Sequence, residues 1–314
     1  MLTMAIAATA CGGDDDKVII GGGGSTPINT AGQNTNRNTT GPAEARERFE
    51  FPKLKGTGSE VIVHRAIVLA STGLEDVNYA VEWDTQKDAQ RWSCYQLTPA
   101  MVSSNTAGSV KRYNAQNDGS LSAACQYPND QDLPEEYRLT TDPYKYSGYD
   151  HGHICPSADR QKSAAANYQT FYITNMQPQY NNFNAGLWER MESKVRQWAL
   201  KSDTLYVCKG GTIDAPAHIL EYVCGKSRQQ SRVNSDHVPV PKYFFMAVFR
   251  KSDLKAVAFW TSHTNDDRSG DNLANYAISV DRLEQLTGID FFCNLPDAIE
   301  NAAESVLDLT AWEL

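Results

Sequence analysis

Two polar clusters separated by one predicted strand constrain the fold of this chain more than any other feature. The first cluster, DHGHICPSADR, covers residues 150–160, and the second, NNFNAGLWERMESKVR, covers residues 181–196. Between them, the segment TFYITNMQP at 170–178 carries the aromatic and β-branched residues typical of a strand. A chain that passes from a histidine-bearing segment through a strand and an asparagine-bearing loop into a helix can bring the histidine and the asparagine together.

The helix in the second cluster is predicted by its apolar period. Four large apolar residues recur at i, i+3, i+7 and i+10, which places them on one face of a helix over residues 187–203: Trp188, Met191, Val195 and Trp198. Asn184, Glu192 and Arg196 are spaced by eight and four residues. Each four-residue step turns only about 40° around a helix, so these polar side chains are expected near one another at the edge of the buried face.

The remaining pattern predicts one α+β domain over residues 57–314. Strand-like segments rich in β-branched and aromatic residues occupy 61–70, 77–84, 91–98, 204–211, 243–251 and 255–263. A final helix is expected to begin at Ser279. Strands, then a strand–loop–helix unit, then further strands predict a mixed or antiparallel central sheet with flanking helices.

The first 56 residues predict an export signal and a tether. MLTMAIAATAC, residues 1–11, resembles the end of a bacterial lipoprotein signal in which Cys11 is acylated, and the following GGDDD resembles the acidic segment of surface-exported Bacteroidetes lipoproteins. The alternative is a disordered N-terminus with an unmodified cysteine. Residues 12–56 are too poor in apolar residues to offset chain entropy and predict a flexible tether. We therefore expect an exported protein held at the outer membrane or cell surface.

Six further cysteines are expected to form disulfides if the chain is exported, because an even number of cysteines in an exported chain favours them: Cys94, Cys125, Cys155, Cys208, Cys224 and Cys293. Cys208 and Cys224 flank a turn-rich segment and could close it. The alternative is a set of buried free thiols.

The formal net charge of −9 argues against a protein that coats nucleic acid, because polyanion binding depends on Lys and Arg side chains that neutralise phosphates. Net charge governs solubility and long-range steering, however, and does not exclude a basic cleft on an acidic body.

Together, the two clusters resemble the signature of the DNA/RNA non-specific endonucleases, members of the His-Me finger or ββα-metal superfamily. The first family motif, Asp-Arg-Gly-His with a following Pro-Ser-Ala-Asp-Arg-like run, corresponds to residues 150–153 and 156–160. The second, Asn-x-x-Pro-Gln and then Asn-x-Gly-x-Trp-x-x-x-Glu with an Arg four residues on, corresponds to residues 175–196. The resemblance covers roughly residues 60–300. It implies a ββα-metal finger and metal-dependent cleavage of DNA and RNA, with 5′-phosphate products.

The resemblance also implies a role for each matched residue. His153 matches the family's general base, and a neutral imidazole can take a proton from water near physiological pH. Asn184 matches the single direct protein ligand of a divalent ion, which we expect to be Mg²⁺, with Mn²⁺ or another divalent ion as the alternative. Glu192 would orient waters bound to that ion. Arg196 matches a phosphate-contacting arginine, and Arg112 is a weaker candidate for the family's upstream arginine.

One position departs from the family pattern, because His151 stands where the family usually has Arg. A histidine lacks the permanent charge of arginine, so phosphate binding or turnover is expected to be weaker or more pH-sensitive unless Arg160 or Lys162 compensates. This departure keeps open an alternative function, a surface lipoprotein on the same fold that binds nucleic acid with little or no catalysis.

Simpler roles also remain open for single residues. His153 could be a structural histidine, and Asn184 could be the N-cap of the apolar helix. Glu192 and Arg196 could form an i,i+4 ion pair on a solvated helix face.

The pattern His151-x-His153-x-Cys155 also permits a zinc site, because alternate residues of a strand share one face. Gly152 and Pro156 make an unfavourable strand, and no fourth ligand lies nearby in the sequence. We therefore expect a loop and strand that present a catalytic base.

Overall fold

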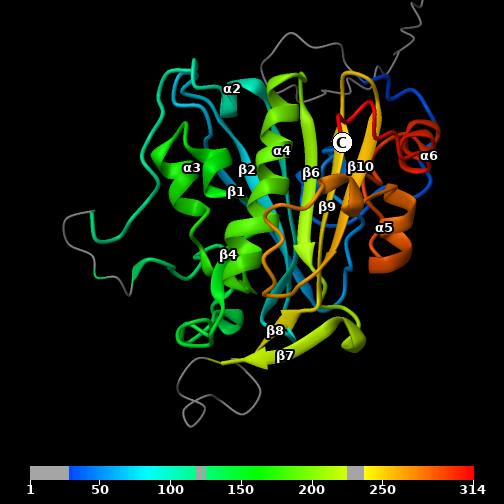
Figure 1. The fold of residues 1–314 in the computed structure, drawn as a ribbon. Helices are drawn as coiled ribbons and strands as arrows, with labels where there is room; N and C mark the ends of the chain where they lie inside the picture. The colour runs from blue at the N-terminus through cyan, green and yellow to red at the C-terminus, as the bar shows by residue number, and fades with distance from the viewer. Residues whose placement is uncertain (1–27, 118–121, 123–124, 225–236) are drawn as a thin grey trace, which may run out of the picture.

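The computed structural model describes residues 28–117, 122, 125–224 and 237–314, and its main feature is a seven-stranded antiparallel sheet (Figure 1). The strand order is β1-β2-β3-β6-β9-β10-β11, with each strand antiparallel to its neighbour. The strands are β1 (Ser59–Ile67), β2 (Glu75–Asp84), β3 (Ala89–Leu97), β6 (Leu205–Gly211), β9 (Tyr243–Arg250), β10 (Lys255–Ser262) and β11 (Ala277–Ile278). The predicted α+β class with an antiparallel central sheet is confirmed.

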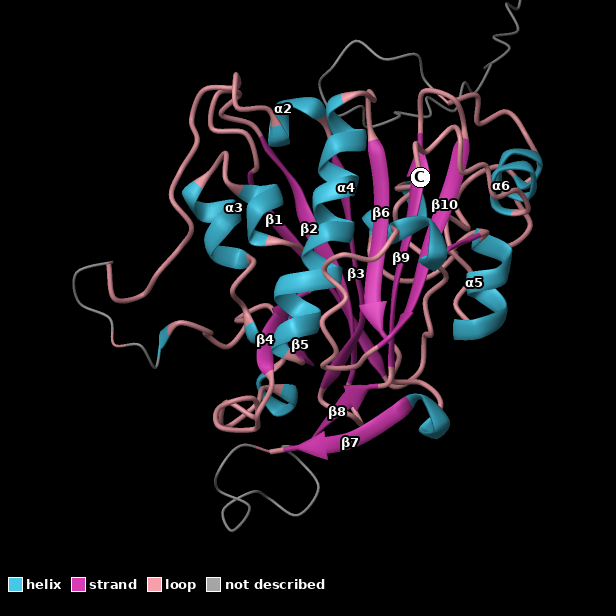
Figure 2. Cartoon of the chain, viewed as in Figure 1, coloured by secondary structure: helices cyan, strands magenta, loops and turns pink. Residues whose placement is uncertain are grey.

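Side chains that alternate along the central strands divide the core into two layers, because successive residues of a strand point to opposite faces. In β6, Val207 belongs to the layer under α4 (Glu189–Leu200), whereas Tyr206 and Cys208 belong to the layer on the other face. Figure 2 shows α4 on one side of β6, β9 and β10, and helices α5 (Val280–Thr287) and α6 (Asp297–Glu304) on the other.

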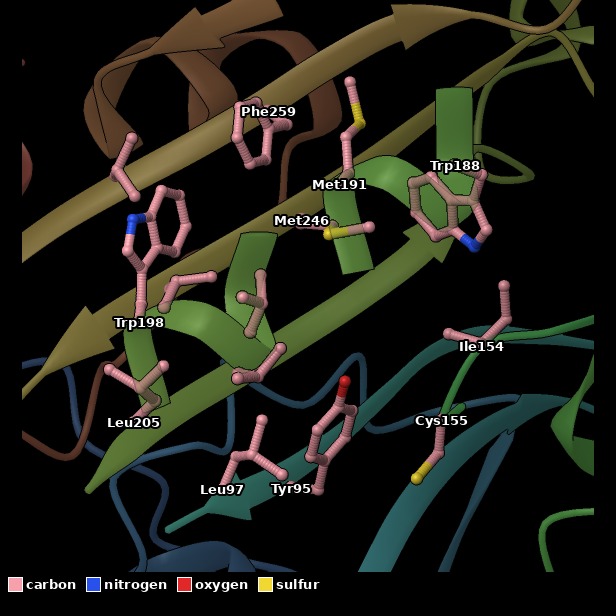
Figure 3. Packing of buried hydrophobic residues seen from close by; sticks show 14 of the residues in the cluster. Tyr95, Leu97, Ile154, Cys155, Trp188, Met191, Trp198, Leu205, Met246 and Phe259 are labelled. Atoms are coloured by element: carbon pink, nitrogen blue, oxygen red, sulfur yellow. The ribbon is translucent and has the colours of Figure 1, made fainter. Parts of the chain in front are cut away.

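The apolar stripe predicted for α4 is the face that packs on the sheet. Trp188, Met191, Val195 and Trp198 are each at most 2 % exposed. Figure 3 shows the tryptophans and Met191 packed with side chains of β3, β6, β9 and β10. Full burial of each large side chain contributes about 1.5–3 kcal/mol. This packing fixes where α4 lies and therefore where its polar edge points.

The opposite layer is closed by α5 and α6. The predicted start of α5 is confirmed, because the Ser279 side chain caps the helix by accepting a hydrogen bond from the backbone N–H of Arg282. Gly288 ends the helix with φ 72°, a left-handed conformation that favours glycine. Val280, Leu283 and Ala303 bury the inner faces of the two helices.

The smaller elements surround the large sheet. They are α1 (Ala43–Glu47), α2 (Pro99–Val102), α3 (Ala164–Gln169) and two further two-stranded sheets, β4–β5 and β7–β8, with strands β4 (Asp150–His153), β5 (Met176–Gln179), β7 (Ile219–Val223) and β8 (Val238–Pro241). None of the helices in the described ranges is both long and apolar enough to span a bilayer.

The segment predicted to be a flexible tether differs from the structure in its C-terminal part. Ala45 and Phe51 are fully buried. The backbone N–H of Asn38 donates a hydrogen bond to Asn294 Oδ1 at 3.1 Å. The segment is polar overall, but the apolar residues Ala45 and Phe51 are buried in the core. Side-chain hydrogen bonds to the C-terminal half of the chain hold other parts of the segment in place. Residues 1–11 and 12–27 lie outside the described residues, as does the expected lipidation site.

The expected disulfides are also wrong. Cys94, Cys125, Cys155, Cys208 and Cys293 are free thiols, so the suggested Cys208–Cys224 bridge is not formed. Four of these five are buried among apolar side chains, where a thiol behaves as a small hydrophobic residue.

Candidate active site

The strands β4 and β5 pair antiparallel and carry the first polar cluster. His151 lies opposite Pro178, and His153 lies opposite Met176. Gly152, between the two histidines, packs against Gln179 so closely that an added Cβ would come within 2.2 Å of Gln179 Cδ. The glycine of the first motif therefore leaves the space that the fully buried Gln179 side chain fills.

The side chain of Asn175 fixes the chain just beyond His153. Its Nδ2 donates to the carbonyls of Cys155 and Thr170 at 2.9 and 2.8 Å, and its Oδ1 accepts from the Cys155 N–H at 2.9 Å and from Ser93 Oγ at 3.1 Å. A buried amide with all these bonds satisfied is a rigid connection. It also explains why the strand predicted over 170–178 begins only at Met176, since the preceding residues form a 3₁₀ turn (Ile173–Asn175) that aims this side chain inward.

Asn184 lies inside a π-helical turn, Phe183–Trp188, that leads directly into α4. The predicted alternative of a helix N-cap is wrong, because the Asn184 N–H already donates to the Tyr180 carbonyl at 2.8 Å within the helical turn. Its Nδ2 donates to Asp150 Oδ2 at 3.1 Å. Asp150 thus fixes the amide group so that Oδ1 remains as the acceptor. Single π turns of this kind occur frequently at functional sites.

The six side chains selected from the sequence line one open cleft of about 480 Å³: Arg112, His151, His153, Asn184, Glu192 and Arg196. They come from the loop before β4, from β4, from the π turn and from α4. The first and second polar clusters therefore meet in space, as the order of the predicted elements required.

His153 has a buried ring nitrogen and an imidazole that is neutral at pH 7. Its ring packs edge-on against Phe171 at 4.8 Å, and its Nε2 is buried without a hydrogen-bond partner among the described residues. Burial and the positive charge of Arg112 lower the pKa of His153 well below the usual 6.5. The imidazole is therefore neutral at pH 7 and has a nitrogen available to accept a proton.

His151 is held in a defined position on the cleft wall. Its Nε2 lies 2.9 Å from both carboxylate oxygens of Asp142, and its ring stacks on Tyr127 at 3.7 Å and contacts Tyr144 edge-on. Burial acts to raise the pKa of Asp142, but the pKa is lowered because the contact with His151 and the backbone N–H groups of Tyr144 and Lys145 together outweigh burial. Asp142 therefore stays ionised at neutral pH and holds the His151 ring in place through this contact.

The proposed compensation for His151 by Arg160 or Lys162 is wrong. Arg160 is 1 % exposed, and its guanidinium donates to the carbonyls of Asn78, Gln96 and Asp159. Lys162 is buried as well and donates to the Thr106 carbonyl and to Ser109 Oγ. Both cations fasten loops and do not line the cleft.

Glu192 is paired with a lysine that the sequence patterns did not single out. Lys209 Nζ lies 2.6 Å from Glu192 Oε1, and the Lys209 and Glu192 side chains are only 1 % and 11 % exposed. Burial raises the pKa of Glu192 above its usual value, although the charge of Lys209 acts in the opposite direction. Lys209 also lies over the Trp188 ring at 4.8 Å. The alternative of a solvated helix carboxylate is therefore wrong.

The two cleft arginines differ in their partners. Arg196 donates to Asp159 Oδ1 at 3.2 Å and to Glu189 Oε1 at 3.1 Å, so the predicted i,i+4 pair with Glu192 does not form. Arg112 lies over the Phe171 ring at 4.9 Å, and within the described part of the chain it forms no hydrogen bond or ion pair. Arg112 is thus the cleft arginine whose charge is not matched by a neighbouring carboxylate.

The zinc site suggested by the H-x-H-x-C pattern is wrong. Cys155 lies in the apolar core under α4, and burial raises the pKa of its thiol to about 12, whereas a zinc ligand must be a thiolate. Among the described residues, the clusters able to hold a metal by His, Cys or carboxylate do not include His151, His153 or Cys155.

Sequence reasoning missed Lys209, Asp142 and Asp150. A signal for Lys209 was present, because alternation along TLYVCKGG places Leu205, Val207 and Lys209 on one buried face. A lysine in a buried stripe requires an anionic partner. Asp150 was visible in the first motif, but its contact with Asn184 spans 34 residues. No sequence pattern encodes such a contact.

The sequence comparisons all point to one family of nucleases. Residues 68–298 match the model of the DNA/RNA non-specific endonuclease family. The chain is 30 % identical over 242 residues to a nuclease of Nostoc sp., an alignment that covers 73 % of this chain and 76 % of that protein. It is 26 % identical over 238 residues to the mitochondrial endonuclease G of Caenorhabditis elegans, with 72 % and 71 % covered. Against the mitochondrial nuclease EXOG of Xenopus laevis, it is 26 % identical and spans 58 % of that protein.

Comparison with solved structures supports the fold. A chain in the crystal structure of the EndoG/EndoGI complex superposes with a TM-score of 0.55 at 21 % sequence identity, covering 69 % of this chain and 84 % of that one. At this identity the likeness concerns the fold alone.

Proposed function

Because the chain belongs to the DNA/RNA non-specific endonuclease family, we propose that it is a metal-dependent endonuclease that hydrolyses phosphodiester bonds of DNA and RNA with low sequence specificity. In this proposal His153 takes the proton from the attacking water, and Asn184 holds a divalent ion, Mg²⁺ in the first instance. The family assignment supports the nuclease activity, and the cleft supports the individual roles.

The observation that carries the proposal is the state of His153. A general base must be unprotonated and within reach of the water it activates. Burial and Arg112 keep this imidazole neutral, and its Nε2 has no partner among the described residues. A purely structural histidine in so polar a site would be expected to use both ring nitrogens, as His263 does with the Tyr180 N–H and the Pro241 carbonyl.

The chemistry of Asn184 fits a hard divalent ion. With Nδ2 bound to Asp150, the amide presents a neutral oxygen to the cleft. Mg²⁺ is commonly held by one or two protein oxygens, keeps several waters and accepts phosphate oxygens from the substrate. When bound, the ion would stabilise negative charge on the phosphoryl group and on the leaving oxygen. Glu192, fixed by Lys209, has a carboxylate positioned to orient water at the edge of the same cleft.

The cationic side chains of the cleft fit phosphates and not base edges. Arg112 and Arg196 present guanidinium groups, which bind phosphate oxygens in pairs, and His151 beside Asp142 contributes a further donor. Contacts to the phosphate backbone position nucleic acid without selecting its sequence. Low sequence specificity follows, and the local charges explain how a chain of net charge −9 binds a polyanion.

A binding protein without catalysis is the second candidate, because His151 replaces the family arginine. We test the two functions by incubating supercoiled plasmid and single-stranded RNA with the protein, with Mg²⁺ and with EDTA. Endonuclease activity predicts nicked and then linear plasmid and shortened RNA in Mg²⁺, and intact substrates in EDTA. Retardation of intact plasmid under both conditions would instead favour the binding protein.

We also propose that the protein is an exported lipoprotein anchored through a lipid on Cys11. The apolar run of small residues before Cys11 and the acidic segment after it support this proposal. Expression in a bacterium with radiolabelled palmitate tests it. Label in the wild type that is lost in Cys11→Ser supports the anchor, and equal label in both, or none in either, contradicts it.

A further inference from the structure

A cluster of acidic side chains is formed by residues of α5 and α6. Figure 1 shows these two helices on the side of the sheet away from α4. Asp281 and Glu284 come from α5, and Glu304 comes from the end of α6. One carboxylate oxygen from each of the three lies within 4.8 Å of the others. The cluster is separated from the cleft by the large sheet, because α4 and α5–α6 pack on opposite layers of the core.

Two more carboxylates surround these three. Glu300 lies one helical turn before Glu304 on α6, and Asp290 follows α5. None of the five forms an ion pair within the described ranges. Burial and the charges of the other four carboxylates raise the pKa of Glu304 to about 10. Like charges at i and i+4 of a helix, and carboxylates buried without a cation, both destabilise a fold.

Lys53 lies near the cluster but, in the described part of the chain, forms no ion pair with its carboxylates. Lys53 lowers the pKa of Asp290, which burial raises, but its ammonium group donates to the main-chain carbonyls of Asn36 and Arg37. Asn36 instead supplies amide hydrogens to Asp290 and Glu300, at 3.2 and 2.8 Å. The donors that contact the cluster are therefore neutral, and none of its carboxylates is bound to a cationic side chain within the described ranges.

Two oxygen atoms of the cluster have no hydrogen-bond partner among the described residues. Glu304 is only 4 % exposed, and its Oε1 is buried and unpaired. Asn36 Oδ1 is also buried and unpaired. Buried polar atoms in folded proteins are almost always hydrogen-bonded, so unpaired oxygens among carboxylates indicate a missing positively charged ligand or a shared proton.

We propose that Asp281, Glu284 and Glu304 bind a divalent cation of the Ca²⁺ type that joins α5 to α6. Ca²⁺ takes six to eight oxygen ligands at about 2.3–2.6 Å. Oxygens on opposite sides of such an ion are about 4.8 Å apart, and neighbouring ones are closer, so the three carboxylates need little movement. The group offers only carboxylate oxygens, whereas structural zinc sites are built from Cys and His, so its donor set favours a hard cation such as Ca²⁺. Mg²⁺ demands a tighter octahedron and retains its waters, so it is expected to bind more weakly.

The experiment uses the Asn184→Ala protein, which lacks the ion ligand proposed in the cleft and so isolates the second site. After removal of metals, Ca²⁺ binding is measured by equilibrium dialysis and thermal unfolding is followed with and without Ca²⁺. One equivalent of bound Ca²⁺ and an increase in Tm of about 5 °C are expected at a hundredfold excess over Kd. Mg²⁺ at the same concentration is expected to raise Tm less.

The matched variants are Glu304→Gln and Glu47→Gln in the same background. Glu304→Gln keeps the side-chain shape and is expected to lose the bound Ca²⁺ and the Tm shift, whereas Glu47→Gln changes an exposed carboxylate and is expected to keep both. No Ca²⁺ binding to the parent protein overturns the proposal and means that the carboxylates share protons. Equal binding by parent and Glu304→Gln also overturns it, because the ion would then lie elsewhere. Nuclease activity enters none of these outcomes.

Discussion

Two regions on opposite sides of the sheet, the cleft and the acidic cluster of α5 and α6, differ in what surrounds their carboxylates. In and around the cleft, Glu192 is paired with Lys209, and Asp159 is paired with Arg196. Behind the sheet, Glu300 and Glu304 are buried with only carboxylates and a neutral amide around them. The cleft contains Arg112, which has no ion-pair partner among the described residues, and the cluster contains carboxylates whose pKa burial raises, that of Glu300 to about 8 and that of Glu304 to about 10. The ion pairs within each region, and not the net charge of −9, therefore decide which region favours a polyanion and which favours a cation.

The largest effect is expected from removing Asn184, the proposed ligand of the ion in the cleft. Asn184→Ala should lower the rate of plasmid cleavage by at least about 100-fold, because a bound ion contributes several kcal/mol to catalysis and each 1.36 kcal/mol is tenfold in rate. The rate is measured in a Mg²⁺ series. Unchanged Mg²⁺ dependence in this variant would show that the ion is held elsewhere.

Asp150→Ala tests the same site with a smaller expected effect. The amide of Asn184 loses the hydrogen bond that orients it but keeps its oxygen. Metal affinity is expected to fall about 10–100-fold, as it does when groups that orient metal ligands are removed. High Mg²⁺ should therefore restore Asp150→Ala but not Asn184→Ala.

Lys209→Met leaves the buried carboxylate of Glu192 without its cation, as the carboxylates of the α5–α6 cluster are. Removing one partner of a buried pair costs about 3–5 kcal/mol, so the free energy of unfolding in urea should fall by an amount in this range. Protonation of Glu192 would moderate the loss at low pH. The double variant Lys209→Met/Glu192→Gln should recover most of the stability. If the single and double variants are equally stable, the pair contributes little to the fold.

The smallest expected effect is a shift in pH dependence. The pKa of His153 is lowered below 6.5, so the base stays neutral at mildly acid pH and the acidic limb of kcat/KM should lie below pH 6.5. The same shift affects stability. Below pH 6.5 the unfolded state binds a proton that the folded state does not, so the contribution of His153 to stability falls as the pH is lowered. Rates and unfolding curves measured from pH 5 to 8 test both statements, and an acidic limb at or above 6.5 would contradict them.

Much of the fold could be predicted because it depends on local periods. The stripe through Trp188 and Trp198 and the β-branched runs of the large sheet are encoded within ten or so neighbouring residues. The strand expected over 170–178 begins only at Met176, because the Asn175 side chain forms hydrogen bonds with nearby backbone carbonyls in place of strand pairing. A propensity scale does not include this competition. The prediction of a flexible tether does not hold at Ala45 and Phe51, because these apolar residues pack against residues far along the chain.

The candidate site was predictable to the extent that motif residues converge. His153, Asn184 and Glu192 come from segments whose order along the chain forces them together. Lys209 and Asp142 were not found, because each acts through a pairing that depends on the three-dimensional fold. The acidic cluster of α5 and α6 was not found either, since its carboxylates look like an ordinary solvated helix face in the sequence and become unusual only through burial.

The most direct test of the central claim is the cleavage rate of His153→Ala, measured beside its affinity for the same plasmid in the absence of Mg²⁺. Loss of a general base lowers the rate by about 10²–10⁴-fold. Binding, which we assign to Arg112, Arg196 and His151, should change by less than about threefold. A large loss of rate with unchanged affinity is the expected result. Equal rates for the variant and the wild type would contradict the assignment of His153 as the base, and with it the account of the cleft.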